Sequence, residues 1–302
     1  MSLIKRVGRT SLKRPRGRVT LPPEWIGKDV IVLSQEEYSY WKKRDKNLFL
    51  VKTIFQEILN SKSNGRRMFN VVTKTWNPVS GCLHHCSYCW ARKLANTKLK
   101  NSHRYKEGFK PRLNEEEFKT RFKDGDFVFV SDMGDLFGDF IPREWILKVL
   151  EHIQHFPKTF FLFLTKNPGR YEKFLEDMPE NAILGATIET NRDKLYLENV
   201  ISGAALPSIR YDAMKKLKWD KKFISVEPIL DFDLEVLCKW VKDISPFMMY
   251  VGYDNYHNRL PEPPLSKTLK FLEEISEVTL VVRKTIKPAW FERLESHLDG
   301  IQ

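Results

Sequence analysis

The sequence predicts an α/β fold, a full or partial parallel (β/α) barrel with a small N-terminal β-rich module. From residue 68 onward, short β-branched or aromatic runs alternate with amphipathic stretches of helical period, which is typical of parallel βαβ units. Right-handed crossovers between such units curl a sheet into a barrel. The chain has 302 residues, enough for one large domain and a small appendage.

The barrel domain is expected over residues 68–302. Its strands are expected at 71–76, 127–131, 159–165, 183–188, 223–226, 247–251 and 278–282. Its clearest helices are expected at 143–155, 168–177, 234–243 and 266–275. Because barrel active sites gather at the carboxyl ends of the strands, the loops that follow the strands are the first place to look for chemistry.

Residues 1–45 are expected to form a small basic β-hairpin module. Short strands at 19–21 and 30–33 flank a turn at Gly27. The segment 46–67 reads as a connecting helix and linker. The hairpin pattern resembles the AbrB-like DNA-binding modules, and a lone hairpin cannot bury a core. The resemblance implies a dimer formed through this module.

Half of the net charge of the chain lies in that module. The net charge is +12, and residues 1–45 contribute 11 Lys/Arg against 5 Asp/Glu, a balance of +6. Such a cluster can neutralise nucleic-acid phosphates, or it can be a solvated tail that aids solubility. The composition, 42% hydrophobic and 30% charged, describes a soluble globular protein. No apolar run is long enough for a membrane span, so we expect the protein not to enter a membrane. Cysteines that do not form a disulfide framework indicate a reduced compartment, so we expect a cytoplasmic protein.

Three of the four cysteines lie in one run, at Cys82, Cys86 and Cys89, and the fourth is Cys238. This distribution is not a disulfide framework. Cys86 and Cys89 could form a dithiol redox pair, and the three cysteines with His84 or His85 could close a zinc site. Three thiolates without a fourth also suit a [4Fe–4S] cluster that keeps one iron open.

The spacing C-x3-C-x2-C, with Tyr88 before the last cysteine, resembles the cluster loop of the radical S-adenosylmethionine (radical-SAM) superfamily. The resemblance implies a radical-SAM type of barrel with two cofactors, a [4Fe–4S] cluster and S-adenosylmethionine (SAM). In the superfamily, the open iron binds SAM, and an electron from the cluster cleaves it to a radical that abstracts a hydrogen. The resemblance also implies an external electron donor and places Tyr88 near the adenine.

Polar residues follow several predicted strands and are the remaining site candidates. Gly134 and Asp135 stand where the superfamily has a Gly-Gly-Glu segment for the SAM amine, although the glycine pair is missing here. Thr187 and Glu189 stand where the superfamily often binds the SAM ribose or carboxylate. A carboxylate just past a buried strand is costly without a partner. Glu189 and Glu227 are therefore the predicted catalytic residues, with structural ion pairs as the alternative.

The segments 75–82, 134–138, 164–168 and 225–228, in this order, resemble an uncharacterised, phage-associated branch of radical-SAM proteins. More distantly, the loop style is similar to the spore photoproduct lyases, which repair a thymine dimer in DNA and use an extra cysteine as hydrogen donor. Only Cys238 follows the cluster loop here, and in an amphipathic stretch it reads as a buried helix cysteine.

The sequence thus predicts a radical-SAM enzyme of unknown reaction type that acts on a nucleic acid, DNA or RNA, recognised through the N-terminal module. One alternative is a radical-SAM enzyme for a peptide or small molecule. The other is a non-enzymatic iron–sulfur or zinc protein that binds DNA and senses redox state.

Overall fold

The structure is a computed structural model that describes Phe69 and residues 71–292. The predicted hairpin module at 1–45 and the connecting segment at 46–67 lie outside the described residues. Within the described part of the chain, no helix is both long and apolar enough to cross a bilayer.

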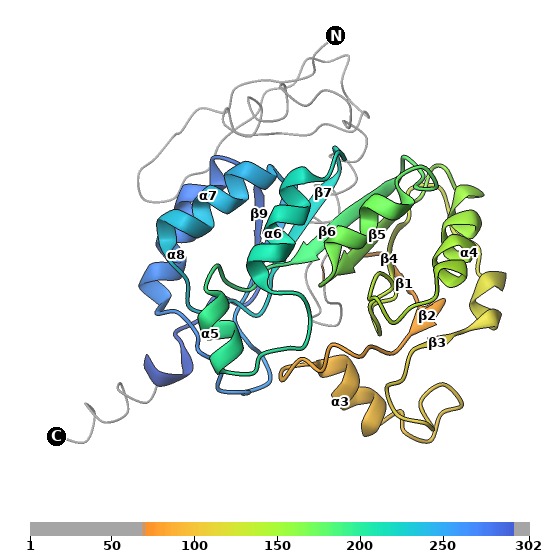
Figure 1. Ribbon diagram of the computed structural model, residues 1–302, viewed down its shortest axis with the longest axis horizontal. Helices are drawn as coiled ribbons and strands as arrows, with labels where there is room; N and C mark the ends of the chain where they lie inside the picture. The colour runs from red at the N-terminus through yellow and green to blue at the C-terminus, as the bar shows by residue number, and fades with distance from the viewer. Residues whose placement is uncertain (1–68, 70, 293–302) are drawn as a thin grey trace, which may run out of the picture. The chain divides into compact units, whose positions relative to one another are not determined.

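A single parallel sheet of seven strands forms the centre of the described domain (Figure 1). Each strand pairs with the one that follows it in the sheet, in the order β1-β4-β5-β6-β7-β8-β9. The strands are β1 (Lys74–Trp76), β4 (Phe127–Val130), β5 (Phe160–Thr165), β6 (Ala182–Thr187), β7 (Lys222–Val226), β8 (Met248–Val251) and β9 (Leu280–Arg283). This order is the one that successive crossovers of one hand produce. All seven predicted strands are present, so the predicted α/β class is confirmed.

The sheet curls into an open, partial barrel. The ring of Phe69 lies 5.4 Å from that of Phe129 on β4, 5.2 Å from Phe223 on β7 and 4.7 Å from Tyr250 on β8. Because β5 and β6 separate β4 from β7, one ring reaches all three strands only where the sheet wraps around it. β1 and β9 are the two edges of the sheet.

Helices cover the outer face of the sheet (Figure 1). Val128 and Val130 of β4 share a buried cluster with Ile146 and Val149 of α4, and full burial of such a side chain contributes about 1.5–3 kcal/mol. The helices are α3 (Trp90–Asn96), α4 (Arg143–Gln154), α5 (Asp193–Glu198), α6 (Pro207–Lys216), α7 (Leu234–Ile244) and α8 (Leu265–Ser276).

The predicted helices are confirmed at α4, α7 and α8, whereas the segment expected at 168–177 is a 3₁₀ helix, η4 (Pro168–Phe174). A second 3₁₀ helix is η3 (Glu115–Lys119). A small antiparallel pair, β2 (Val79–Ser80) with β3 (Arg112–Leu113), was not predicted. Its strands are two residues long, too short for the period-2 pattern that identifies a strand. The pair fixes the chain where it enters the cysteine loop.

Candidate active site

The cysteine loop runs from the end of β2 to the start of α3, at the carboxyl edge of the sheet. Its backbone is tied to neighbouring loops: the Gly81 N–H donates to Met133 O (2.9 Å) and the Cys82 N–H to Phe109 O (3.1 Å). Gly81 has a φ of +87°, and a Cβ there would lie 2.0 Å from Lys110 O. Only glycine fits this position, so the start of the loop is held against the chain that returns to β3.

The three thiols of the loop are free and partly buried. Backbone N–H groups donate to two sulfurs, from His84 to Cys82 Sγ (3.5 Å) and from Arg92 to Cys89 Sγ (3.3 Å). Cys86 Sγ lies 3.1 Å from Ser202 Oγ. Each sulfur therefore has one N–H or hydroxyl neighbour that can donate a hydrogen bond to a thiolate.

Burial governs the acidity of two of these thiols. It raises the pKa of Cys82 and of Cys86, and the Lys166 ammonium opposes that rise at Cys86. Since the thiolate is the form that binds a metal, a cation beside the loop favours the ligand state of Cys86.

The imidazoles of both histidines in the loop have partners other than the sulfurs. His84 Nε2 lies 2.9 Å from Asp135 Oδ2, and His85 Nδ1 contacts the Arg92 guanidinium. In the described segments, no three His, Cys, Asp or Glu side chains, the three loop thiols included, are grouped to hold one metal ion. The engaged imidazoles give no support to a zinc site closed by His84 or His85.

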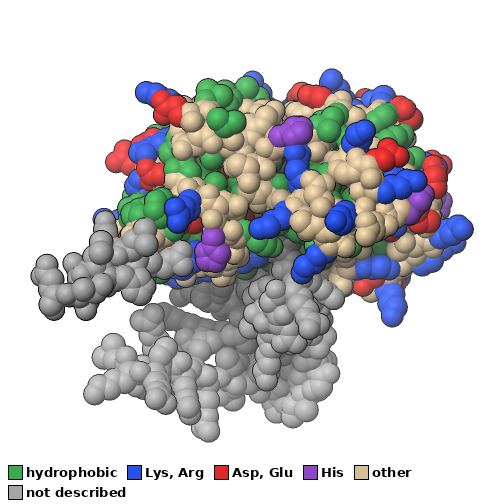
Figure 2. Space-filling model, turned by 90° about the horizontal axis from the view of Figure 1, so that it is seen from below, with side chains coloured by type: hydrophobic (Ala, Val, Ile, Leu, Met, Phe, Trp, Pro, Cys, Tyr) green, Lys and Arg blue, Asp and Glu red, His purple; other side chains and the backbone are tan. Residues whose placement is uncertain are grey.

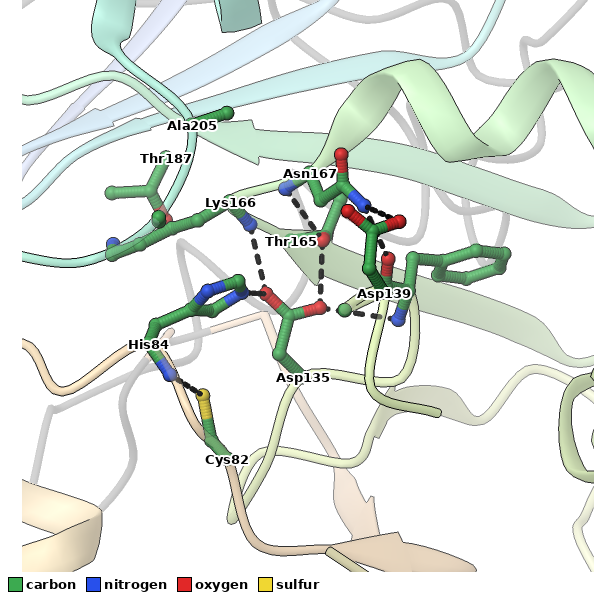
Figure 3. Close-up of polar contacts among 12 residues, drawn as sticks. Cys82, His84, Asp135, Asp139, Thr165, Lys166, Asn167, Thr187 and Ala205 are labelled. Carbon is green, nitrogen blue, oxygen red and sulfur yellow. Dashed lines mark hydrogen bonds and ion pairs between the residues drawn. The ribbon is translucent and has the colours of Figure 1, made fainter. Parts of the chain in front are cut away.

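Asp135 is a buried hub that joins the cysteine loop to the end of β5 (Figure 3). Its carboxylate accepts from His84 Nε2 (2.9 Å), Thr165 Oγ1 (2.6 Å) and the backbone N–H groups of Lys166 (2.9 Å) and Phe137 (3.1 Å). Burial alone would raise the pKa of Asp135, but the hydrogen bond and charge of His84 outweigh it and lower the pKa. Asp135 therefore stays ionised and positions His84.

Gly134 provides a close backbone approach. It forms an isolated parallel bridge with Gly81, and a Cβ on Gly134 would lie 3.0 Å from Gly81 O. The absence of a side chain lets the loop after β4 rest directly on the start of the cysteine loop.

Glu189 lies at the centre of a buried charge network beside the loop. It is 0% exposed, and its carboxylate accepts from the Tyr88 hydroxyl, from Lys166 Nζ (3.1 Å) and from Arg210 Nη1 (2.6 Å). Burial would raise its pKa, but Arg210, then Lys166 and Tyr88, lower the pKa of Glu189 to about 2. At neutral pH it is a fixed anion that holds two cations.

The same network fixes Tyr88 and Arg210. The Lys166 ammonium lies 5.3 Å from the centroid of the Tyr88 ring. Arg210 is fully buried and also donates to the carbonyl oxygens of Thr187 (2.8 Å) and Ala205 (2.6 Å). The predicted site residues Tyr88, Thr187 and Glu189 are thus brought together through Arg210.

Glu227 lies apart from this network, after β7. Its Oε1 lies 3.1 Å from Lys284 Nζ, and its Oε2 accepts a long hydrogen bond of 3.4 Å from Ser225 Oγ. Burial raises the pKa of Glu227, and Lys284 only partly opposes the rise.

Hydroxyl side chains line the interior face of the curved sheet, the face that Phe69 also contacts. Thr187 pairs in register with Ser225, and Ser225 with Tyr250, whose ring touches Phe69. Residues in register on neighbouring strands share a face, so Thr187 and Ser225 point into the barrel interior. Glu189 and Glu227 follow these two residues at the mouth.

Cys238 lies elsewhere. It is 2% exposed on α7, in the cluster between the sheet and the outer helices, and burial raises its pKa to about 12. This is the position of a structural cysteine, as the sequence predicted.

Four residues of the site were not singled out from the sequence: Lys166, Ser202, Arg210 and Lys284. Lys166 directly follows β5, so the rule that selected Glu189 and Glu227 would have found it if it had covered cations as well as carboxylates. Arg210 lies within α6, whose sequence gives no local sign of a buried charge. It joins Glu189 only in the folded chain.

Spore photoproduct lyase and SuiB, two radical-SAM enzymes of known structure, have a similar fold. A cysteine-to-serine mutant of spore photoproduct lyase matches with a TM-score of 0.50 and 13% identity, over 70% of this chain and 76% of the lyase. Streptococcus suis SuiB bound to precursor peptide SuiA matches with a TM-score of 0.51 and 11% identity, over 85% of this chain and 68% of SuiB. At such low sequence identity, the structural similarity shows only a shared fold, which is the partial (β/α) barrel.

No curated protein matches the sequence. The family model for DUF5131, described as a protein of unknown function, matches residues 68–241, which is more than half of the chain. The chain therefore belongs to the DUF5131 family.

Proposed function

We propose that this protein is a radical-SAM enzyme in which Cys82, Cys86 and Cys89 hold a [4Fe–4S] cluster. The observation that carries the proposal is the loop of three free, partly buried thiols at the carboxyl edge of a radical-SAM type of barrel. When bound, the cluster and SAM would supply the radical that abstracts hydrogen from a substrate. The reaction type is left open.

The donor set suits such a cluster. Three soft thiols lie in one loop, and the fourth cysteine, Cys238, is on the outer side of the sheet. N–H and hydroxyl donors already face the sulfurs, and such hydrogen bonds tune iron–sulfur sites. The oxidisable cluster also supports a reduced, cytoplasmic compartment and requires an electron donor.

In this proposal the chain's own residues divide into positioning and binding groups. Asp135 has four donors around its carboxylate, so its role is to orient His84 and the cysteine loop. Gly134 permits the close approach of the two loops. Tyr88 is the aromatic surface for the SAM adenine, and Glu189 holds its hydroxyl in place.

Thr187 and Glu227 face the substrate side. The Thr187 hydroxyl lies on the interior face of β6, where it can bind a polar group of SAM. Glu227 is the carboxylate whose pKa burial raises, so it is the group suited to take up or release a proton during turnover. Glu189 is too strongly held by Arg210 and Lys166 to do so.

The proposed substrate class is nucleic acid. The sequence support is the +6 balance of residues 1–45, which favours phosphate binding. A chain with Arg14, Arg16 and Arg18 changed to Gln should bind nucleic acid more weakly. Equal affinity in the full chain and in a chain that starts near residue 46 would favour a peptide or small-molecule substrate instead.

The test of the proposed activity is SAM cleavage. Protein reconstituted anaerobically with iron and sulfide and reduced by dithionite should form 5′-deoxyadenosine slowly without substrate. The matched control is Cys86→Ala treated in the same way. If the wild type forms no more 5′-deoxyadenosine than this control, the enzyme proposal is wrong and the DNA-binding redox sensor becomes the better account.

A further inference from the structure

The segment that follows the cysteine loop is the most basic stretch of the described domain. Residues 92–112 contain eight Lys or Arg and one acidic residue, Glu107, a balance of +7 against +12 for the whole chain. They cover α3 and the turns that lead to β3. The basic residues are spread over 21 residues and do not form one run of adjacent Lys or Arg.

Two of the arginines already have protein partners. Arg104 pairs with Glu116 and Glu117, and the Arg92 guanidinium donates to Cys82 O (2.9 Å). The remaining lysines are exposed, and within the described residues none of them forms an ion pair: Lys93, Lys98, Lys100, Lys106 and Lys110. Five like charges with no protein anion are available for an anionic ligand.

A rigid turn after β8 presents an aromatic ring at the same edge of the sheet. The buried Asp254 carboxylate accepts from the Tyr256 N–H (3.1 Å), from the Asn258 N–H (2.7 Å) and from Asn258 Nδ2 (2.9 Å). Within this turn Tyr256 is 51% exposed, and His257 and Arg259 are exposed as well. Asp254 therefore fixes the turn that carries an exposed aromatic ring, an imidazole and the Arg259 guanidinium.

Both features lie at the carboxyl edge, where the cysteine loop lies. In Figure 1 this edge is the lower side, which carries α3. Seen from that side, Lys and Arg side chains are spread across the face, and acidic side chains lie mainly toward its margins (Figure 2). An anionic polymer that crosses this face would pass the mouth of the barrel.

We propose that the carboxyl face binds a single-stranded nucleic acid. The lysines at positions 93, 98 and 100 contact its phosphates, and a base stacks on Tyr256. Stacking on an exposed aromatic requires an unpaired base, which is why a single strand fits better than a duplex. The exposed ring also favours a nucleic acid over an acidic protein. This face would be the substrate-binding surface of the proposed enzyme, so the inference rests on the proposed function. The binding itself can be measured without turnover.

The test measures affinity by fluorescence anisotropy with short labelled oligonucleotides, as DNA and as RNA, without SAM or reductant. The first variant is Lys93→Gln/Lys98→Gln/Lys100→Gln. Its matched control is Lys123→Gln/Lys216→Gln/Lys218→Gln, which removes three exposed lysines that precede β4 and β7, at the opposite edge. Because the N-terminal arginines are also expected to bind phosphate, all variants carry Arg14→Gln, Arg16→Gln and Arg18→Gln.

The lysine variant should lose about tenfold in affinity at near-physiological salt and flatten the log–log salt slope by about two units, since each neutralised phosphate of a single strand contributes about 0.7. The control should bind like its parent. Equal losses in the variant and the control would mean general charge attraction and would overturn the proposal. An unchanged strand affinity, with slower reduction by an acidic electron-transfer protein, would assign the surface to a redox partner instead.

Tyr256 separates base stacking from phosphate contact. Tyr256→Ala should weaken binding of an ordinary strand about tenfold and leave binding of an abasic strand unchanged, whereas Tyr256→Phe should bind like its parent. Equal losses for both strands, or tighter binding of the matched duplex, would overturn the single-strand proposal. A protein that binds as expected and yet never cleaves SAM would overturn the proposed enzyme activity alone.

Discussion

Glu189 and Glu227 follow neighbouring strands of one sheet, and both are acidic residues at the mouth of the barrel, yet their surroundings differ. Glu189 is fully buried with two cations and a phenol around it, and its pKa is lowered to about 2. Glu227 has one cation and one long hydrogen bond, and burial raises its pKa. The same residue type is a fixed anion at one position and a carboxyl group with a raised pKa at the other.

The difference arises from the partners, which come from distant parts of the chain. Arg210 of α6 is itself buried and needs an anion, and Glu189 supplies it. Lys284, after β9, keeps a side-chain exposure of 25%, so water shares in solvating the charge beside Glu227. A carboxylate with full compensation is fixed, whereas one with partial compensation can change its protonation state.

The largest effect expected from this comparison is the loss of Glu189. Glu189→Gln leaves the buried Arg210 charge without its anion, and breaking a buried pair costs about 3–5 kcal/mol. Urea titration should show this loss in the free energy of unfolding. Glu227→Gln serves as the matched control, and an equal loss in the two variants would contradict the distinction between the two carboxylates.

The pH dependence of stability should have opposite signs at the two positions. The folded pKa of Glu189 is about 2, below the ordinary value of about 4.3. Its contribution is therefore complete above that ordinary pKa and is lost as the pH falls through the folded pKa. The stability gap between the wild type and Glu189→Gln should be constant near neutral pH and should narrow below about pH 4.

For Glu227 the folded pKa is raised, so the fold favours the protonated form. Its contribution is present below the ordinary pKa and is lost as the pH rises through the folded pKa. As the pH rises through the folded pKa of Glu227, the wild type should lose stability relative to Glu227→Gln. Unfolding titrations of both variants at several pH values check the two signs, and slopes of the same sign would be incompatible with these assignments.

A smaller effect is expected at Asp135. In wild type, four hydrogen-bond donors face the Asp135 carboxylate. Asp135→Asn replaces one carboxylate oxygen with an NH₂ group that cannot accept from them, and each buried donor left unpaired lowers the free energy of unfolding by about 1–3 kcal/mol. Asp132→Asn is the control, because Asp132 accepts one side-chain hydrogen bond, from Asn77 Nδ2 (2.6 Å), and burial raises its pKa. We expect a loss of about 2 kcal/mol for the first variant and less than about 1 kcal/mol for the second, measured by urea unfolding. Equal losses would show that Asp135 is not a hub.

The smallest effect is expected at Glu227 at neutral pH. Glu227→Gln keeps a hydrogen-bonding group near Ser225 and leaves Lys284 with access to water, so the unfolding free energy should change by less than about 1 kcal/mol. If Glu227 handles a proton during turnover, substrate conversion should fall although SAM cleavage without substrate persists. A loss of basal SAM cleavage would place Glu227 in cofactor binding instead.

The strands could be predicted from the sequence because a strand buried on both faces is a continuous apolar run, as in β5 (Phe160–Thr165). The cysteine loop could be predicted because its residues are neighbours in sequence. The roles of Glu189 and Glu227 could not be separated, because they depend on Arg210 and Lys284. These partners lie 21 and 57 residues away, and no spacing rule links them.

The central claim, that the cysteine loop holds an iron–sulfur cluster, is tested most directly by metal analysis. Anaerobically reconstituted wild type should bind about four irons and four sulfides. Cys82→Ala, Cys86→Ala and Cys89→Ala should each lose them, whereas Cys238→Ala, on the outer side of the sheet, should keep them. Stoichiometric zinc without iron-dependent visible absorbance, or an iron content that does not depend on the three loop cysteines, would contradict the claim.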